Sequence, residues 1–129
     1  MTKQEHIDYW LNTAKEDEIT MNLLFKDGRY AHCLFFGHLY IEKICKALWV
    51  KNHIGNTPPY IHNLLKILAG IETGLTNEEL VFLEQLNEYQ LSSRYPNYTD
   101  TLKKRTSKGL TLLYLKTIKE IDTCLRKNL

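Results

Sequence analysis

One stretch of the sequence, "SSRYPNYTD" at residues 92–100, carries residue types that could take part in chemistry. It places the guanidinium of Arg94 beside two phenol rings, those of Tyr95 and Tyr98. An arginine can hold a phosphate group through several N–H donors, and an aromatic ring can stack on a nucleobase. The combination therefore predicts a site for a nucleotide or for RNA.

A basic run, "LKKRTSKG", follows this stretch and contains Lys103, Lys104 and Arg105. We place the run near the start of the last helix, where positive charge opposes the helix dipole and does not stabilise the helix. These side chains could instead contact phosphate groups. The alternative is that they form a solvated face while the preceding tyrosines pack against the loop.

Cleavage of RNA would require a group that transfers a proton beside the arginine, and histidine is the most frequent choice. The histidines lie at positions 6, 32, 38, 53 and 62, so none follows Arg94 in the sequence. A ribonuclease site would therefore need Arg94 with Tyr98, or with His38 across a dimer. Tyrosine is a poor base at neutral pH, because a phenol ionises only near about pH 10.

Four ionisable side chains fall on helix faces that are otherwise apolar, namely those of Asp17, His38, Glu42 and Arg94. Burying a lone charge is unfavourable, so we expect such groups to pair with one another. They form a structural network, the partly exposed edge of a stripe, or a polar cleft for a ligand. His38 and Glu42 are spaced to bind a metal, but two ligands are a weak signal. We predict neither a metal nor a cofactor.

The elements that must position these residues are predicted to be five helices without any strand. Apolar residues recur at steps of three and four along most of the chain, which is typical of amphipathic helices. The central helix is apolar on most of its circumference, so we expect it to be the most buried. The predicted helices span residues 2–26, 29–52, 61–72, 76–93 and, after the loop "YPNYTD", a last segment that runs to near the C-terminus.

Local signals set the ends of the fourth predicted helix. Thr76 and Glu79 have the spacing of a capping box, in which each side chain binds the backbone of the other residue. Pro96 disfavours helix for the residue before it, so the helix should end near Tyr95. Arg94 would then lie on the inward-facing stripe of its last turn.

Short connections between these helices predict an all-α fold, an antiparallel up-and-down bundle of four long helices and one short helix. At 129 residues the chain is expected to form a single domain over residues 1–129. No apolar run approaches the roughly 18 residues of a membrane span. The first residues are polar and begin a helix, so we expect no secretory signal, no membrane partner and a cytoplasmic location.

Charge is distributed unevenly along the chain. Residues 1–93 carry 8 Lys or Arg against 12 Asp or Glu, whereas residues 94–129 carry 9 against 3. A basic C-terminal segment indicates an anionic partner, such as a nucleotide or RNA. The alternative is that it faces an acidic helix of the same chain.

Several pieces of the sequence, in order, resemble those of a known family, the HEPN domains (higher eukaryotes and prokaryotes nucleotide-binding). The resemblance covers most of the chain and is least specific in the last helix. The pieces that carry it are Ala14 with Asp17, the turn Gly28-Arg29-Tyr30, Glu42-Lys43 with Lys46-Ala47, "IHNLL" at Ile61–Leu65, and "RYP" at Arg94–Pro96.

The resemblance implies a helical bundle that pairs as a homodimer with a polar cleft at the interface. Many similar bacterial proteins bind a minimal nucleotidyltransferase encoded beside them, as in toxin–antitoxin pairs. Many others are metal-independent ribonucleases with an arginine and a histidine separated by four to six residues. Arg94 matches that arginine, but positions 99, 100 and 101 hold Thr, Asp and Thr. This departure favours binding over cleavage.

The sequence therefore predicts a non-catalytic HEPN-type homodimer that binds a nucleotide or RNA, or that partners a nucleotidyltransferase. The binding site would include Arg94, the two nearby tyrosines and the basic run. One alternative is a metal-independent, toxin-like ribonuclease with a degenerate site based on the arginine. Another is a structural dimerisation module that has no ligand.

Overall fold

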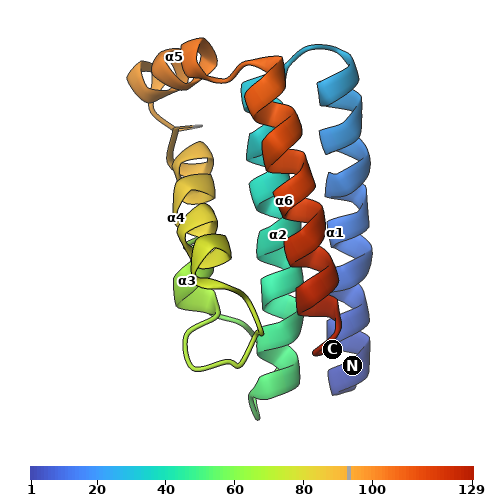
Figure 1. Cartoon of the computed structure of the whole chain (residues 1–129). Helices are drawn as coiled ribbons and strands as arrows, with labels where there is room; N and C mark the ends of the chain where they lie inside the picture. Colours follow the sequence, from blue (N-terminus) through green and yellow to red (C-terminus); the bar gives the residue numbers. More distant parts are fainter. Residues whose placement is uncertain (93) are drawn as a thin grey trace.

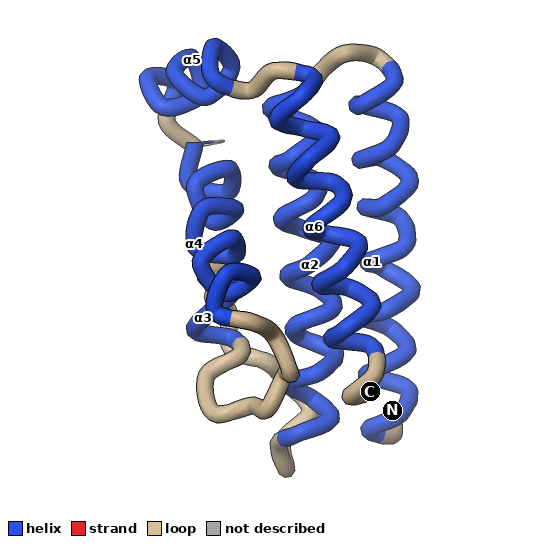
Figure 2. Tube along the Cα trace, viewed as in Figure 1, coloured by secondary structure: helices blue, strands red, loops and turns tan. Residues whose placement is uncertain are grey.

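The structure is a computed structural model of the chain, and it describes residues 1–92 and 94–129. These residues form six α-helices and no strand (Figures 1 and 2). The predicted all-α class is therefore confirmed. The helices are α1 (Lys3–Lys26), α2 (Tyr30–Asn52), α3 (Leu64–Ile67), α4 (Asn77–Ser92), α5 (Pro96–Arg105) and α6 (Lys108–Arg126).

The long helices pack as a bundle around α2, which contacts α1, α4 and α6 (Figure 1). The segment predicted to be most buried is indeed α2, whose fully buried side chains include Leu34, Ile41, Ile44 and Leu48. The short helix α5 crosses one end of the bundle, while both chain termini lie at the other end. No helix in the described part of the chain is both long and apolar enough to cross a membrane.

Helices α1 and α6 approach α2 closely at Gly37. A Cβ atom at this position would lie 2.9 Å from Ile118 Cδ1 and 3.4 Å from Met21 Sδ. The missing side chain therefore leaves room for a side chain from each neighbouring helix, and the three helices share one compact core.

Lys3, in the first turn of α1, binds the far end of α2. Its ammonium donates hydrogen bonds to the carbonyl oxygens of Val50 at 2.8 Å and His53 at 2.7 Å, and to Asn56 Oδ1 at 2.8 Å. The last carbonyl groups of a helix have no partners within the helix, so a cation near them is stabilising. Lys3 thereby fixes the α2 terminus against α1.

The predicted start of α4 is confirmed in its atomic detail. The Glu79 N–H donates to Thr76 Oγ1 at 3.1 Å, and the Thr76 N–H donates to Glu79 Oε1 at 3.0 Å. These two bonds form the reciprocal capping box.

The third helix is shorter than predicted. It covers Leu64–Ile67 rather than residues 61–72. Asn63 caps it, since its Oδ1 accepts from the backbone N–H groups of Leu65 at 3.1 Å and Lys66 at 3.3 Å. Gly70, whose φ angle is +78°, then turns the chain away from helical geometry.

The prediction of a loop at "YPNYTD" is wrong, because α5 begins at Pro96. Proline suits the first turn of a helix, where its φ angle fits and its missing N–H costs no hydrogen bond. Ser107 then starts α6, and its Oγ accepts from the Leu110 N–H at 3.1 Å. The described part of the chain thus has one more helix than the five that were predicted.

The basic run also occupies a different place from the one predicted. Lys103, Lys104 and Arg105 form the last turn of α5 rather than the start of the final helix. Positive charge at a helix C-terminus is favourable to the helix dipole. The charges therefore stabilise α5 while their ends remain exposed to solvent.

Candidate functional site

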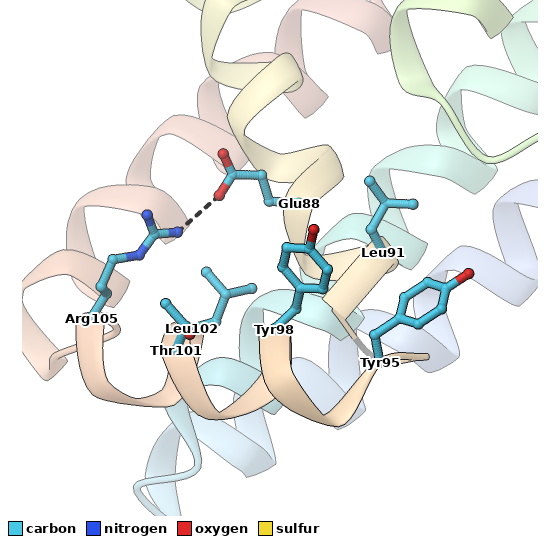
Figure 3. Close-up of a pocket in the computed structure, with 7 residues that line it drawn as sticks. All are labelled: Glu88, Leu91, Tyr95, Tyr98, Thr101, Leu102 and Arg105. Carbon is cyan, nitrogen blue, oxygen red and sulfur yellow. Dashed lines mark hydrogen bonds and ion pairs between the residues drawn. The ribbon is translucent and has the colours of Figure 1, made fainter.

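A groove of about 580 Å³ lies between the C-terminal part of α4 and one face of α5 (Figure 3). Apolar and aromatic side chains form most of it, and an ion pair closes one end. Its lining residues are Glu88, Leu91, Tyr95, Tyr98, Thr101, Leu102 and Arg105.

The periodicity of α5 builds one wall of the groove. Tyr98, Leu102 and Arg105 follow one another at steps of four and three, which places them on a single helix face. Leu102 is buried against the bundle, whereas the Tyr98 ring is 66% exposed. This wall therefore presents an accessible aromatic surface above an apolar floor.

Two phenol rings stand together at the start of α5. The ring centroids of Tyr95 and Tyr98 are 6.2 Å apart, and the ring planes are inclined by 72°. Both rings are more than half exposed. Exposed aromatic faces of this kind can stack on a nucleobase.

An ion pair joins the two walls at the other end of the groove. Arg105 Nη2 on α5 lies 2.9 Å from Glu88 Oε2 on α4. The side chains are 58% and 54% exposed, so solvent screens their attraction and the pair adds little stability. The pair can therefore open at low cost to admit a polar ligand.

One buried and one part-buried hydrogen bond hold α5 against α4. The hydroxyl groups of Tyr89 and Thr106 are 2.8 Å apart, and the Thr99 hydroxyl donates to the carbonyl oxygen of Ser92. Burial raises the pKa of the Tyr89 phenol, which keeps that hydroxyl protonated. These bonds set the spacing of the groove walls.

The structure brings only some of the predicted binding residues to this groove. Tyr95, Tyr98 and Arg105 line it. Lys103 instead lines a smaller neighbouring pocket of about 250 Å³ beside the α1–α2 turn, and Lys104 lies exposed on α5.

The predicted inward orientation of Arg94 is wrong. The described part of α4 ends at Ser92, and the predicted helix end at residue 93 lies outside the described residues. Arg94 lies exposed in the turn before α5 and does not face the interior of this chain. Its backbone N–H donates to the carbonyl oxygen of Leu91 at 3.2 Å. Because Leu91 lines the groove, Arg94 stands next to the groove rather than inside the bundle.

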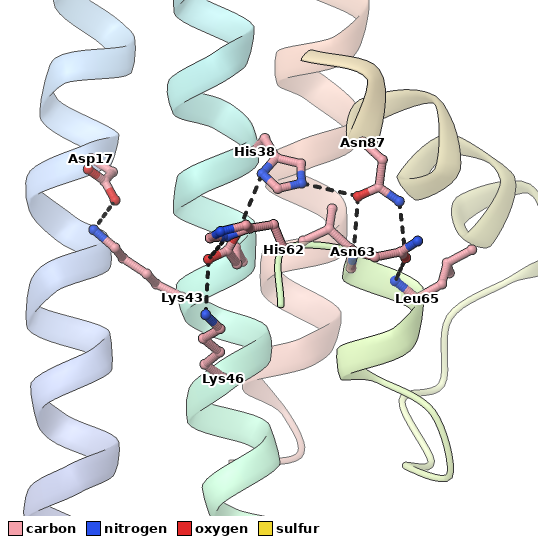
Figure 4. Close-up of polar contacts among 10 residues, drawn as sticks. Asp17, His38, Lys43, Lys46, His62, Asn63, Leu65 and Asn87 are labelled. Carbon is pink, nitrogen blue, oxygen red and sulfur yellow. Dashed lines mark hydrogen bonds and ion pairs between the residues drawn. The ribbon is translucent and has the colours of Figure 1, made fainter. Parts of the chain in front are cut away.

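A second group of polar residues surrounds the carboxylate of Glu42 on α2. Figure 4 shows His38, Lys46 and His62, which belong to this group. Lys46 Nζ lies 3.2 Å from Glu42 Oε2, and His62 Nδ1 lies 3.1 Å from Glu42 Oε1. His38 Nδ1 is 3.7 Å from the same Oε1. His38 and Glu42 therefore lie side by side, as expected, within a larger network.

The network continues from His38 to the amide of Asn87 on α4. Asn87 Oδ1 accepts the backbone N–H of Leu64 at 3.1 Å, and Asn87 Nδ2 donates to Asn63 Oδ1 at 3.2 Å. These contacts fix which end of the amide carries oxygen, so His38 Nε2, 3.1 Å from that oxygen, must carry a proton.

His38 is neutral in this environment. Burial lowers the pKa of His38, and with Nε2 protonated the other ring nitrogen, Nδ1, carries a lone pair. That Nδ1 is buried without a hydrogen-bond partner among the described residues. Because His38 is fully buried, its position is inconsistent with the alternative in which it acts with Arg94 across a dimer.

Asp17 lies apart from this network. Its Oδ2 is 2.6 Å from Lys43 Nζ, so it pairs with a cation on the adjacent helix rather than with His38 or Glu42. The four ionisable residues singled out in the sequence therefore do not form one cluster. The structure places His38 and Glu42 together, Asp17 with Lys43, and Arg94 at the surface.

The sequence reasoning did not assign Lys46, His62, Asn63 and Asn87 to this network. They contact Glu42 or His38, directly or through one another, over sequence separations of up to 49 residues. The available signals were the polar Asn87 on an apolar stripe and the segment "IHNLL". In the described part of the chain, no group of three or more His, Cys, Asp or Glu side chains is arranged to hold a metal ion.

Comparisons with known proteins agree on the type of domain. The family model described as "HEPN domain" matches residues 7–126. No curated protein matches the sequence at a significant level. A solved structure, TT1696 from Thermus thermophilus, is similar with a TM-score of 0.77 and 18% identity, over 95% of this chain and 98% of that chain. That likeness concerns the fold, while the family match spans nearly the whole sequence, so this chain belongs to the HEPN domain family.

Proposed function

We propose that this HEPN domain binds a nucleotide, free or within single-stranded RNA, in the groove between α4 and α5. The observation that carries the proposal is the exposed ring pair of Tyr95 and Tyr98 in a groove that ends at Arg105. A stacking surface beside a cation suits the two chemical parts of a nucleotide, an aromatic base and an anionic phosphate.

Further cations lie around the groove. Arg94 is exposed next to Tyr95, and Lys103 and Lys104 are exposed on the last turn of α5. Phosphate contacts from such side chains provide affinity without regard to base sequence, and they attract an RNA strand over a distance. We therefore assign phosphate binding to these cations and base stacking to the tyrosines.

The bound nucleotide is not cleaved in this proposal. Among the described residues that line the groove there is no histidine, and the sequence has none after His62. His62 itself binds Glu42, and His38 is buried. The described groove therefore lacks the histidine that most often transfers protons beside an arginine, and its one carboxylate, that of Glu88, is paired with Arg105.

The proposed protein is a homodimer, as the family resemblance implies. Pairing of two copies would bring two grooves into one assembly and raise avidity for an RNA strand that can reach both. The proposal of a nucleotidyltransferase partner is supported by the family resemblance alone. The proposal of nucleotide binding is also supported by a groove whose side chains suit a nucleotide.

Fluorescence anisotropy with a short labelled single-stranded RNA of mixed sequence tests the site. Removal of one stacking ring by Tyr98→Ala should weaken binding by about 5- to 150-fold, the range for loss of one base–aromatic stack. The matched control is Tyr60→Ala, because Tyr60 is 92% exposed in the loop between α2 and α3 and does not line the groove. Equal affinity of both variants and the wild type would show that the groove is not the site.

The same samples test the absence of cleavage. After incubation with wild-type protein in the presence of a chelator, the RNA should keep its full length on a denaturing gel. Cleavage that is lost in Arg94→Ala would establish the ribonuclease alternative instead.

A further inference from the structure

We infer that the groove between α4 and α5 selects guanine over the other bases, an inference that rests on the proposed function. The feature responsible is the ion pair between Glu88 and Arg105, which lies at the end of the groove away from Tyr95 (Figure 3). The proposed function requires only stacking and phosphate contacts, so base selection is an additional property of the site.

The pair presents an acceptor and a donor side by side. Glu88 Oε2 and Arg105 Nη2 are 2.9 Å apart, one on each wall of the groove. A carboxylate offers two acceptor oxygens, and a guanidinium offers five N–H donors. A base edge that reaches this pair can therefore donate to Glu88 and accept from Arg105 at once.

Guanine has the matching edge. Its N1–H and N2–H groups are adjacent donors that can bind the two oxygens of one carboxylate, and its O6 and N7 atoms accept from an arginine. Adenine and cytosine each offer one amino group next to a bare ring nitrogen, whose lone pair would face a carboxylate oxygen. Uracil offers one N–H between two carbonyl groups. Only guanine presents two neighbouring donors.

The position of Tyr98 directs a stacked base toward the pair. Tyr98 and Arg105 lie on the same face of α5, two turns apart, with Leu102 between them at the floor. Glu88 reaches toward this space from α4 (Figure 3). A base that stacks on Tyr98 over the apolar floor thus meets the carboxylate with its edge.

The exposure of the pair lets it exchange partners. Both side chains are more than half exposed, so their mutual attraction is weak in water. A bound guanine can replace Arg105 as the hydrogen-bond donor to the Glu88 carboxylate. Arg105 can then donate to O6 or N7 of the base, or to a phosphate. Glu88 is therefore a specificity-determining residue in this inference.

Isothermal titration calorimetry with GMP, AMP, CMP and UMP tests the selection. We expect GMP to bind about 5- to 150-fold more tightly than the other nucleotides, the range for one good bidentate contact. Glu88→Gln should remove most of the ratio between the GMP and AMP affinities, because its amide nitrogen cannot accept from a base. Glu84→Gln, one turn earlier on the exposed side of α4, is the matched control.

A second arm distinguishes the source of the guanine. Single-stranded RNA oligomers of equal length, one containing guanine and one lacking it, are compared with GMP in competition. A guanine oligomer that competes better than GMP identifies RNA, whereas equal or weaker competition identifies a free nucleotide.

The outcomes separate the two proposals. Equal affinity of wild-type protein for all four nucleotides overturns guanine selection and leaves nucleotide binding intact. A GMP preference that survives in Glu88→Gln overturns the role of this carboxylate. Failure of every nucleotide and oligomer to bind overturns the proposed function and guanine selection together. Circular dichroism of each variant excludes misfolding as the cause of lost preference.

Discussion

The Nε2 atom of His38 lies 3.1 Å from the side-chain oxygen of Asn87, and the backbone N–H of Leu64 binds that same oxygen. One amide group thus joins α2, the start of α3 and α4. Since the groups that meet here are buried, each hydrogen bond replaces a contact with water that folding removed.

Asn87→Ala should destabilise the fold, because it leaves the His38 Nε2–H and the Leu64 N–H buried without their acceptor. Each orphaned donor costs about 1–3 kcal/mol, so we expect a loss of at least about 2 kcal/mol in the free energy of unfolding. Urea denaturation followed by circular dichroism measures this loss. Gln85→Ala, at an exposed position of the same helix, should change little. If Asn87→Ala unfolded at the same urea concentration as the wild type, the Asn87 amide would not contribute to stability as expected.

Stability should fall as the pH is lowered, because burial lowers the pKa of His38 in the folded protein. The unfolded chain binds a proton at this histidine once the pH drops below about 6.5, whereas folded His38 stays neutral until its own lower pKa is reached. Protons therefore favour unfolding throughout that interval. The contribution reaches at most about 1.4 kcal/mol for each pH unit.

Comparison of wild type with His38→Gln isolates this contribution. The variant keeps an amide N–H near the position of Nε2 but lacks a group that titrates, so its unfolding free energy should vary less between pH 7 and pH 5. His32→Gln, which removes an exposed histidine from the first turn of α2, is the matched control. Parallel curves for all three proteins would argue against a depressed His38 pKa.

Lys3→Met should loosen the end of α2, because it removes the ammonium from the carbonyl oxygens of Val50 and His53. Hydrogen bonds from charged groups contribute about 1.5–3 kcal/mol, and partial exposure of this site places our expectation near the lower end. Thermal melting should show a lower Tm than that of Lys15→Met, which removes an exposed lysine from the same helix. Identical melting temperatures would show that the ammonium is dispensable.

Removal of Lys103 or Lys104 should make RNA binding less sensitive to salt. A cation that contacts a phosphate of single-stranded RNA contributes about 0.7 to the slope of log K against log salt. Each single alanine variant should lower the slope by about that amount, while Lys116→Ala on α6 serves as the control. Unchanged slopes would place the RNA backbone away from the last turn of α5.

The periodic apolar pattern was sufficient to predict the bundle. It located α1, α2 and α4 to within a residue or two, since these helices bury one or more continuous faces. Pro96 was misinterpreted because proline both ends and begins helices, and only the surrounding structure distinguishes the two roles. Among the described residues of α5, only Leu102 is buried. The sequence of this helix therefore shows little of the apolar periodicity by which the longer helices were predicted.

The candidate site was predicted in part. Tyr95 and Tyr98 were identified by residue type, and they line the groove. Glu88 could not be recognised, because its role depends on the angle between α4 and α5, which one sequence does not reveal. Arg94 was placed on an inward-facing stripe, aimed at the interior or a dimer cleft, whereas it lies exposed in the turn before α5.

The attachment of α5 has a consequence for how ligand binding and chain dynamics are related. The α4 wall belongs to the bundle, whereas the α5 wall is held by Leu102 and by the hydroxyl bonds of Thr99 and Thr106. Local opening of α5 thus abolishes the groove while the bundle persists, and a ligand that spans both walls must oppose that opening. Amide hydrogen exchange within α5 is consequently a direct and local readout of occupancy.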